Sequence, residues 1–211
     1  MRVQSGVSAT MTMPLSETEA LHRSWVERAQ AGDRAAQEDL ARHCQRLAYL
    51  VALQLTGNRD DALDLAQDAM VRFFGALHRF DRSRPLRPWL LRIVRNLYRD
   101  RLRRRRIRRT EALENVSPAA LTEAAGPAPD PEARSERREL QRLVWEELQK
   151  LPLKDREVLV LRDYQDLEYS EIARVLRIPR GTVMSRLHRA RRRLAEAVHR
   201  RMKPGEEGHD A

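Results

Sequence analysis

The chain has 211 residues, and its 41 lysines and arginines exceed its 31 aspartates and glutamates by 10. Charged residues make up 34% of the chain and aromatic residues 5%, and glycines and β-branched runs are few, which disfavours a β-sandwich or β-barrel. The single cysteine, Cys44, excludes an intramolecular disulfide and a cysteine-rich zinc site. We find neither a signal-peptide core nor an apolar run of about 18 residues. The composition therefore predicts an all-α, cytoplasmic protein without direct membrane insertion, whose partner is a polyanion such as nucleic acid.

The charge is distributed in blocks along the chain. Residues 99–109 (RDRLRRRRIRR) contain eight arginines and one acidic residue. Residues 110–136 reverse the sign, with six acidic residues, one arginine and several prolines, as is typical of a tether. Residues 180–203 are basic again. We therefore expect two small helical domains, at 16–107 and 135–203, joined by a flexible acidic linker at 108–134, with disordered ends at 1–15 and 204–211.

Apolar residues at helical spacing predict three helices in the N-terminal domain. Asp33 is the expected N-cap of the first, which should end near Gly57. Asp60 and Asp61 open the second, where acidic residues suit the positive end of the helix dipole. After a proline-punctuated loop over residues 80–87, a third helix buries one apolar stripe, formed by Leu86, Trp89, Leu90, Ile93 and Leu97.

The third helix carries the first functional signal. Five polar residues recur at intervals that place them opposite its apolar stripe: Arg92, Arg95, Asn96, Arg99 and Arg103. Guanidinium groups around the amide side chain of Asn96 can form hydrogen bonds with nucleic-acid phosphates and with the edges of bases. From spacing alone, a solvated basic face is an equally good interpretation.

The C-terminal domain contains a more specific pattern. Residues 169–194 (YSEIARVLRIPRGTVMSRLHRARRRL) fit a helix-turn-helix, in which the apolar positions of both helices pack together. Polar residues with DNA-binding chemistry lie near the start of the second helix, where a recognition helix enters the major groove. These are Thr182, Ser185, Arg186, Arg189 and Arg193. A purely structural three-helix bundle is the alternative.

No constellation predicts catalysis or a bound metal. His43 and Cys44 are adjacent and therefore point to different faces of a helix, and the other histidines lack ligand spacing. Paired acids such as Glu146 and Glu147 indicate a helix surface rather than a general acid and base. We expect no metal, no cofactor and no enzyme activity.

Three blocks, in this order and at this spacing, resemble the extracytoplasmic-function sigma factors, which are built from sigma domains 2 and 4 only. Residues 60–81 (DDALDLAQDAMVRFFGALHRFD) resemble the helix that docks on the clamp of RNA polymerase. Residues 87–106 (RPWLLRIVRNLYRDRLRRRR) resemble the helix that melts and recognises the −10 element. Residues 151–194 resemble the domain that recognises the −35 element. The resemblance implies a non-catalytic protein that directs bacterial core RNA polymerase to promoters.

The resemblance also implies roles for individual residues. The β′ clamp of core polymerase would bind Asp61, Asp64, Gln67 and Asp68. The −10 element would be bound by a loop that captures a flipped base, with the helix that follows: Phe80, Arg87, Arg92, Arg95, Asn96, Arg99 and Arg103. The −35 element would be bound by Arg180, Thr182, Ser185, Arg186 and Arg189.

Further partners are implied in the same way. The C-terminal domain would also contact the β flap of the polymerase, and an anti-sigma factor, often membrane-bound, would cover both DNA-reading faces. From its charge we expect the acidic linker to thread a basic channel of the polymerase. One departure from the family is Arg177, in a turn position where Gly, Asp or Asn is frequent; a positive φ there would cost about 1 kcal/mol.

Two other classes of protein would explain parts of the sequence. A stand-alone helix-turn-helix regulator would explain the C-terminal domain, but it should carry an effector or dimerisation domain in place of a second basic helix. A nuclease would explain the positive charge, but the sequence has no carboxylate or histidine cluster with metal-ligand spacing.

Overall fold

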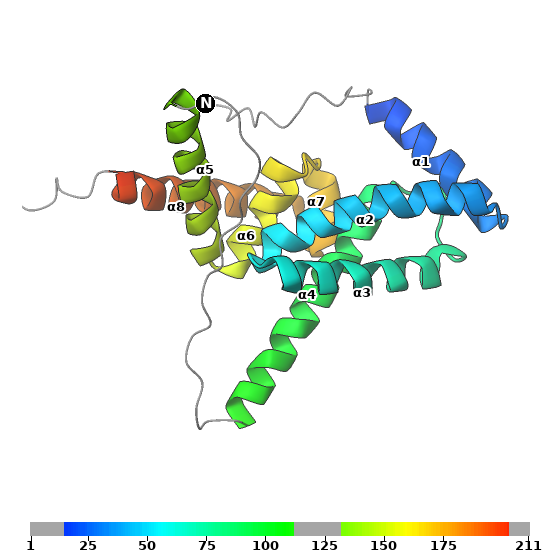
Figure 1. Cartoon of the computed structure of the whole chain (residues 1–211), viewed down its shortest axis with the longest axis horizontal. Helices are drawn as coiled ribbons and strands as arrows, with labels where there is room; N and C mark the ends of the chain where they lie inside the picture. The colour runs from blue at the N-terminus through cyan, green and yellow to red at the C-terminus, as the bar shows by residue number, and fades with distance from the viewer. Residues whose placement is uncertain (1–14, 112–131, 203–211) are drawn as a thin grey trace, which may run out of the picture.

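The computed structural model describes residues 15–111 and 132–202, and all regular secondary structure in these two stretches is helical (Figure 1). The first stretch forms an N-terminal bundle of four helices: α1 (Leu15–Gln30), α2 (Arg34–Thr56), α3 (Arg59–Leu77) and α4 (Leu86–Glu111). The second forms a C-terminal bundle: α5 (Glu132–Lys150), α6 (Leu153–Leu159), the π-helical turn η1 (Val160–Tyr164), α7 (Tyr169–Leu176) and α8 (Arg180–Met202). The prediction of an all-α fold is confirmed for the described residues.

Local signals set the ends of the N-terminal helices. The Asp33 side chain accepts a hydrogen bond from the backbone N–H of Ala36, and Gly57 ends α2 in the left-handed conformation at φ 72°. The cap of α3 is Asn58, whose side chain accepts from the N–H groups of Asp60 and Asp61 at 2.9 and 3.0 Å. The two aspartates therefore lie in the first turn of α3, as expected, but an asparagine before them caps it.

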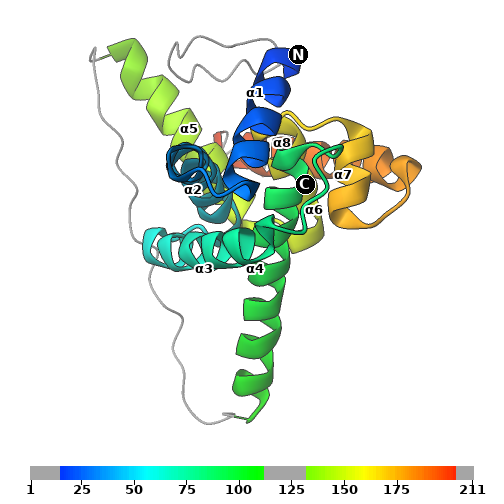
Figure 2. The same cartoon turned by 90° about the vertical axis from the view of Figure 1, so that its right-hand side faces the viewer.

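Helix α4 is buried on two sides rather than one. Leu86, Leu90 and Leu97 of the predicted stripe are buried, but Leu91 and Val94 are fully buried as well. The reason is that α4 packs against α2 and α3 on one side and against α7 of the C-terminal bundle on the other. The C-terminal half of α4 extends beyond both bundles (Figures 1 and 2).

The C-terminal bundle contains the predicted helix-turn-helix as α7, a turn and α8. Ile172 and Leu176 of α7 are buried against Val183 and Leu187 of α8. Arg177 lies in the turn at φ 56°, so the left-handed conformation that we considered for this position is present.

The predicted linker is only partly within the described residues. Helix α4 continues to Glu111 and α5 begins at Glu132, so both ends of the 108–134 segment are helical. Residues 112–131, with most of the linker's acidic side chains, lie outside the described residues, as do residues 1–14 and 203–211. None of the described helices is both long and apolar enough to cross a lipid bilayer.

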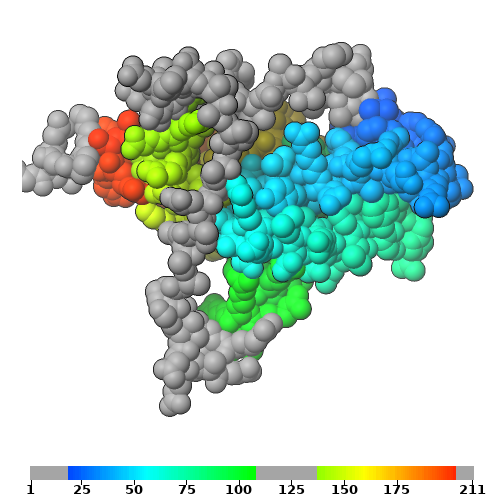
Figure 3. Space-filling model, in the orientation of Figure 1, coloured from blue at the N-terminus to red at the C-terminus, as the bar shows by residue number. Residues whose placement is uncertain are grey.

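The two bundles are packed together, which the sequence did not predict. Their buried apolar side chains form one continuous core; across the junction, α4 contacts α7, and α2 contacts α5 and η1. In the space-filling view, α2 and α3 cover the base of α4 and leave its far end protruding (Figure 3). The consequences for the predicted DNA-binding residues are described next.

Candidate nucleic-acid and polymerase interfaces

The N-terminal half of α8 presents an open polar face. Arg180, Ser185 and Arg189 are exposed, and Thr182 and Arg186 are half-buried at its edge. Within the part of the chain that the structure describes, none of the three arginines forms an ion pair with a carboxylate. Since their positive charge is not neutralised, this face can accept phosphates and base edges.

Several arginines in the C-terminal half of α8 form ion pairs with other helices of the C-terminal bundle. Arg191 pairs with Asp163 of η1, and Arg201 pairs with Glu146 of α5 at 2.7 Å. Arg193, which we had placed near the recognition face, pairs with Asp155 of α6. These contacts fix the C-terminal half of α8 on the bundle.

The C-terminal bundle covers part of the predicted basic face of α4, where Arg95 is buried while Arg99 and Arg103 stay exposed. Arg95 is only 7% exposed, and its Nε donates to Oε1 of Glu157 on α6 at 3.0 Å. Arg99 donates to both carboxylate oxygens of Glu157, at 2.8 and 3.1 Å. Burial lowers the pKa of Arg95, and the neighbouring Glu157 carboxylate opposes that effect. The expectation of a solvent-facing row of arginines on α4 is therefore wrong for Arg95, because the C-terminal bundle packs on that face.

The other predicted −10 residues on α4 surround this contact. Arg87 donates from Nη2 to Oε1 of Gln165 at 3.1 Å, and Asn96 lies half-buried beside Arg95. Arg92 is half-buried next to a shallow pocket, and Arg103 is exposed and pairs with Asp100 within its own helix at 3.1 Å. The structure thus brings the predicted residues together on one side of α4.

The predicted base-capturing loop is built around a stacked aromatic pair. Phe80 stacks on Trp89 with ring centroids 4.3 Å apart, and Trp89 also contacts Phe73 at 4.9 Å. Asp81 accepts hydrogen bonds from the backbone N–H and hydroxyl of Ser83, and these bonds lower the pKa of the Asp81 carboxyl.

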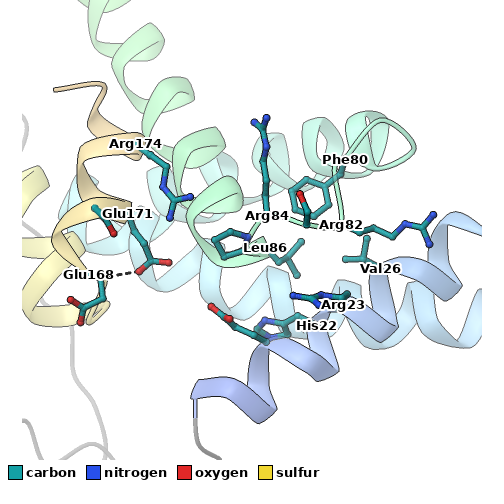
Figure 4. A pocket seen from close by; sticks show the side chains of 14 residues that line it. His22, Arg23, Val26, Phe80, Arg82, Arg84, Leu86, Glu168, Glu171 and Arg174 are labelled. Carbon is teal, nitrogen blue, oxygen red and sulfur yellow. Dashed lines mark hydrogen bonds between the residues drawn. The ribbon is translucent and has the colours of Figure 1, made fainter. Parts of the chain in front are cut away.

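A pocket of about 250 Å³ lies beside this loop. Figure 4 shows the loop side chains Arg82 and Arg84 and the α1 side chain His22 on one side of it, with Glu171 and Arg174 of α7 on the other. The loop and its pocket are therefore partly enclosed by the C-terminal bundle.

The four predicted clamp-binding residues lie along the outer side of α3. Asp64 and Gln67 are exposed. Asp61 pairs with Arg105 of α4 at 2.7 Å, and Asp68 pairs with Arg101 at 2.5 Å. The hydrogen bond from Arg105 to Asp61 raises the pKa of that guanidinium group. Two of the four side chains therefore already have basic partners within the chain.

Sequence reasoning missed several buried polar groups, among them Glu147, which we expected on a helix surface and which is 6% exposed. Glu157 and Gln165 are 1% and 4% exposed and hold the two bundles together. Histidines of α1 and α2 also form a pair, in which Nε2 of the buried His22 lies 2.9 Å from Nε2 of the half-buried His43. The one available signal was the position of Glu157 directly before the apolar run 158–161, where an acid is unusual unless it has a partner. Among the described residues, no group of three potential metal ligands is close enough to hold an ion.

Comparison with known proteins gives a consistent result. Residues 40–108 match the family model of Sigma-70 region 2, and residues 141–194 match that of Sigma-70, region 4. The ECF RNA polymerase sigma factor SigW of Bacillus subtilis is 31% identical over 188 residues, which cover 85% of this chain and 98% of that protein. SigM of Mycobacterium tuberculosis, another ECF RNA polymerase sigma factor, is 35% identical over 168 residues, or 80% of each chain.

Solved structures show the same similarity. CnrH in complex with the cytosolic domain of CnrY is 27% identical, with a TM-score of 0.61 over 85% of this chain and 97% of that one. The sigma factor RpoE in complex with the anti-sigma factor NepR from Bartonella quintana has a TM-score of 0.63 over 77% of this chain and 96% of that one. At 23% identity, the second comparison supports the fold alone.

Proposed function

Because the chain belongs to the extracytoplasmic-function RNA polymerase sigma factors, transcription initiation factors that direct RNA polymerase to promoters, we propose which of its surfaces carry out each step. Residues 16–107 serve as sigma domain 2 and residues 135–203 as sigma domain 4. The polymerase supplies the catalytic groups, and this protein supplies DNA recognition in the cytoplasm. The observation that carries this proposal is that two separate helices, α4 and α8, each present a row of arginines with polar neighbours.

Helix α8 binds the −35 element as intact duplex. The support is its open N-terminal half, where Arg180, Arg186 and Arg189 lack carboxylate partners among the described residues and Thr182 and Ser185 lie between them. A helix of this kind places its first turns in the major groove, where arginine forms bidentate hydrogen bonds with guanine.

Helix α4 and the loop before it bind the −10 element. Phe80 and Arg87 lie at the ends of the loop, and Arg92, Arg95 and Asn96 follow on one side of α4, with Arg99 and Arg103 one and two turns further on. The pocket beside Phe80 supports a role in holding a base that leaves the stack, and the arginines suit the backbone of the separated strand.

The remaining surfaces bind proteins. Asp61, Asp64, Gln67 and Asp68 on the outer side of α3 bind the β′ clamp, and the C-terminal bundle binds the β flap. Two solved relatives are complexes of a sigma factor with a regulator, which supports an anti-sigma partner for this chain as well. The acidic segment 112–131 would follow a basic channel of the polymerase.

The test compares one residue from each reading helix in complexes with core polymerase. We expect Arg186→Ala to weaken duplex binding by about 1–3 kcal/mol, the cost of losing a bidentate base contact. Asn96→Ala should leave duplex binding intact but reduce opening, because its amide faces DNA only near the point of strand separation. Gel shifts measure binding, and permanganate reactivity of promoter thymines measures opening.

A matched control and a rescue make this test specific. Arg192→Ala removes an exposed arginine of the same helix that pairs with Glu196, so it should behave like the unmodified protein. A pre-melted template should rescue Asn96→Ala but not Arg186→Ala. Equal loss of duplex binding in both variants, without rescue of either, would show that the assignment of the two helices is wrong. Specific protection of duplex DNA by the chain alone would instead favour a stand-alone regulator.

A further inference from the structure

The shallow pocket next to Arg92 lies where the two bundles meet and has a volume of about 390 Å³. The end of α3, the loop that follows it and α4 form one side of this junction pocket, and α7 of the C-terminal bundle forms the other. Of the described residues that line it, one, Asp81, is acidic and four are arginines: Arg79, Arg84, Arg92 and Arg174. The junction pocket therefore has a surplus of three positive charges and a volume suited to a small organic ligand.

Arg92 and Arg174 reach this pocket from opposite bundles. Arg92 lies on α4, and Figure 4 shows Arg174 extending from α7 on the side that faces α4. Within the described parts of the chain, neither forms an ion pair or a hydrogen bond with another residue, whereas Arg95 at the same junction donates to Glu157. Two guanidinium groups that share a pocket repel each other. The packing of the bundles thus leaves a positive charge here that a bound anion would neutralise.

The other charged groups of the junction pocket do not neutralise this pair. Asp81 accepts from Nε of Arg84 at 3.1 Å and from the backbone N–H and hydroxyl of Ser83, so its carboxylate is held within its own loop. Nε of Arg79 donates to Nε2 of His78 at 2.9 Å, and no described carboxylate pairs with it. The guanidinium groups can therefore bind an anion with several negative charges.

The junction pocket also has a flat apolar surface. Phe80 and Trp89, which stack with ring centroids 4.3 Å apart, both line it. A nucleobase can add to such a stack, largely independently of which base it is. The pocket lies beside the first turns of α4, where the helix dipole is positive and the first turn contains no acidic residue. Guanidinium groups beside an aromatic surface provide the chemistry that binds a phosphorylated nucleoside.

We propose that the junction pocket binds a free nucleoside diphosphate, with its phosphates between Arg92 and Arg174 and its base against Phe80 and Trp89. Such a ligand carries about three negative charges at neutral pH, which match the positive surplus of the pocket. Since the site needs residues of both bundles, the bound ligand stabilises the contact between them. Arg92 and Phe80 are also assigned to the −10 element, so the ligand and the −10 strand exclude each other, a consequence that rests on the proposed function.

The first test titrates the full-length chain with ADP in a calorimeter. We expect one site per chain, and at least about tenfold weaker binding of adenosine and of pyrophosphate, since each lacks half of the contacts. Arg174→Gln removes a guanidinium group that we assign to neither DNA nor polymerase, and it should weaken ADP binding at least about tenfold. Arg72→Gln, the same change at an exposed arginine of α3 outside the pocket, should leave the affinity unchanged.

Two further readouts do not depend on the affinity of Arg174→Gln. ADP should raise the thermal midpoint of the unmodified protein but not that of Arg174→Gln, whose midpoint without ADP also shows that the variant is folded. A base stacked on Trp89 should quench tryptophan emission. In Trp89→Phe this quenching should disappear, while the affinity for ADP stays within about threefold because an aromatic surface remains.

The outcomes separate a specific site from general attraction to a basic protein. Equal ADP binding by the unmodified protein, Arg174→Gln and Arg72→Gln, or equal binding of ADP and pyrophosphate, would overturn the nucleotide site. Absence of ADP binding would overturn it as well.

Promoter opening with core polymerase separates this site from the assignment of the −10 element. Arg174→Gln should open promoters like the unmodified protein, whereas Arg92→Gln should lose both ADP binding and efficient opening. Loss of ADP binding with normal opening by Arg92→Gln would support the nucleotide site and overturn the −10 role of Arg92. Defective opening by Arg92→Gln without any ADP binding by the unmodified protein would overturn the nucleotide site alone.

Discussion

The contact between the buried His22 and the half-buried His43 gives the stability of the N-terminal bundle a dependence on pH. The Nε2 atoms of His22 and His43 are 2.9 Å apart, so one ring donates and the other accepts, which requires at least one neutral ring. Burial lowers the pKa of His22 to about 4, and the positive charges of His43 and Arg87 act in the same direction. Burial and Arg87 also lower the pKa of His43.

This pair predicts a loss of stability in mild acid. Because the folded pKa of His22 is below its unfolded value of 6.5, its neutral form contributes fully above pH 6.5. As the pH falls from 6.5 to about 4, the unfolded state binds the proton first, and up to about 3 kcal/mol of unfolding free energy is lost. Urea unfolding at several pH values should show this loss, and His22→Gln should show a smaller one. The same slope in both proteins would exclude the histidine pair as its source.

At the scale of elements, the helix-turn-helix contains a local strain that can be removed. Arg177 ends α7 at φ 56° and ψ 51°, a conformation that costs an ordinary residue about 1–2 kcal/mol, whereas glycine adopts it freely. Glycine loses more entropy on folding, so we expect Arg177→Gly to raise the unfolding free energy by a net of about 0.5–1 kcal/mol.

A control within the same element checks this interpretation. Arg174 is exposed in the interior of α7, where glycine lowers helix stability by about 1 kcal/mol relative to a good helix former. Thermal unfolding should therefore give shifts of opposite sign for Arg177→Gly and Arg174→Gly. Destabilisation by both would show that the Arg177 side chain contributes more than its backbone strain costs.

Most of the elements could be predicted because their signals are local. Asp33, Gly57 and the alternation of apolar residues set helix ends and buried faces within a few residues of themselves. The second buried side of α4 could not be predicted in this way. Leu91 and Val94 lie outside the predicted stripe but are fully buried, and α4 also contacts α7, which is about 80 residues away in the sequence.

At the scale of the whole molecule, one candidate site could be predicted from local sequence signals, whereas the exposure of the other depends on contacts between distant parts of the chain. The −35 residues could be predicted as a set because they lie within the first three turns of one helix, α8, with an apolar stripe opposite. The sequence did not predict how far the −10 residues are covered. Arg95 contacts Glu157, which is 62 residues away in the sequence, and Arg87 contacts Gln165, which is 78 residues away. Sequence periodicity places a charged side chain on a face, but only the packing of the two bundles decides whether that face is open.

The central claim is that one chain supplies two separate DNA-reading helices that act only with core polymerase. Transcription of a random promoter library by bacterial core RNA polymerase, with and without this protein, tests it most directly. We predict that transcripts dependent on the protein come from templates enriched in two sequence blocks, near −35 and −10, at a fixed spacing. Enrichment of a single block or a palindrome, or enrichment by the chain without polymerase, would contradict this account.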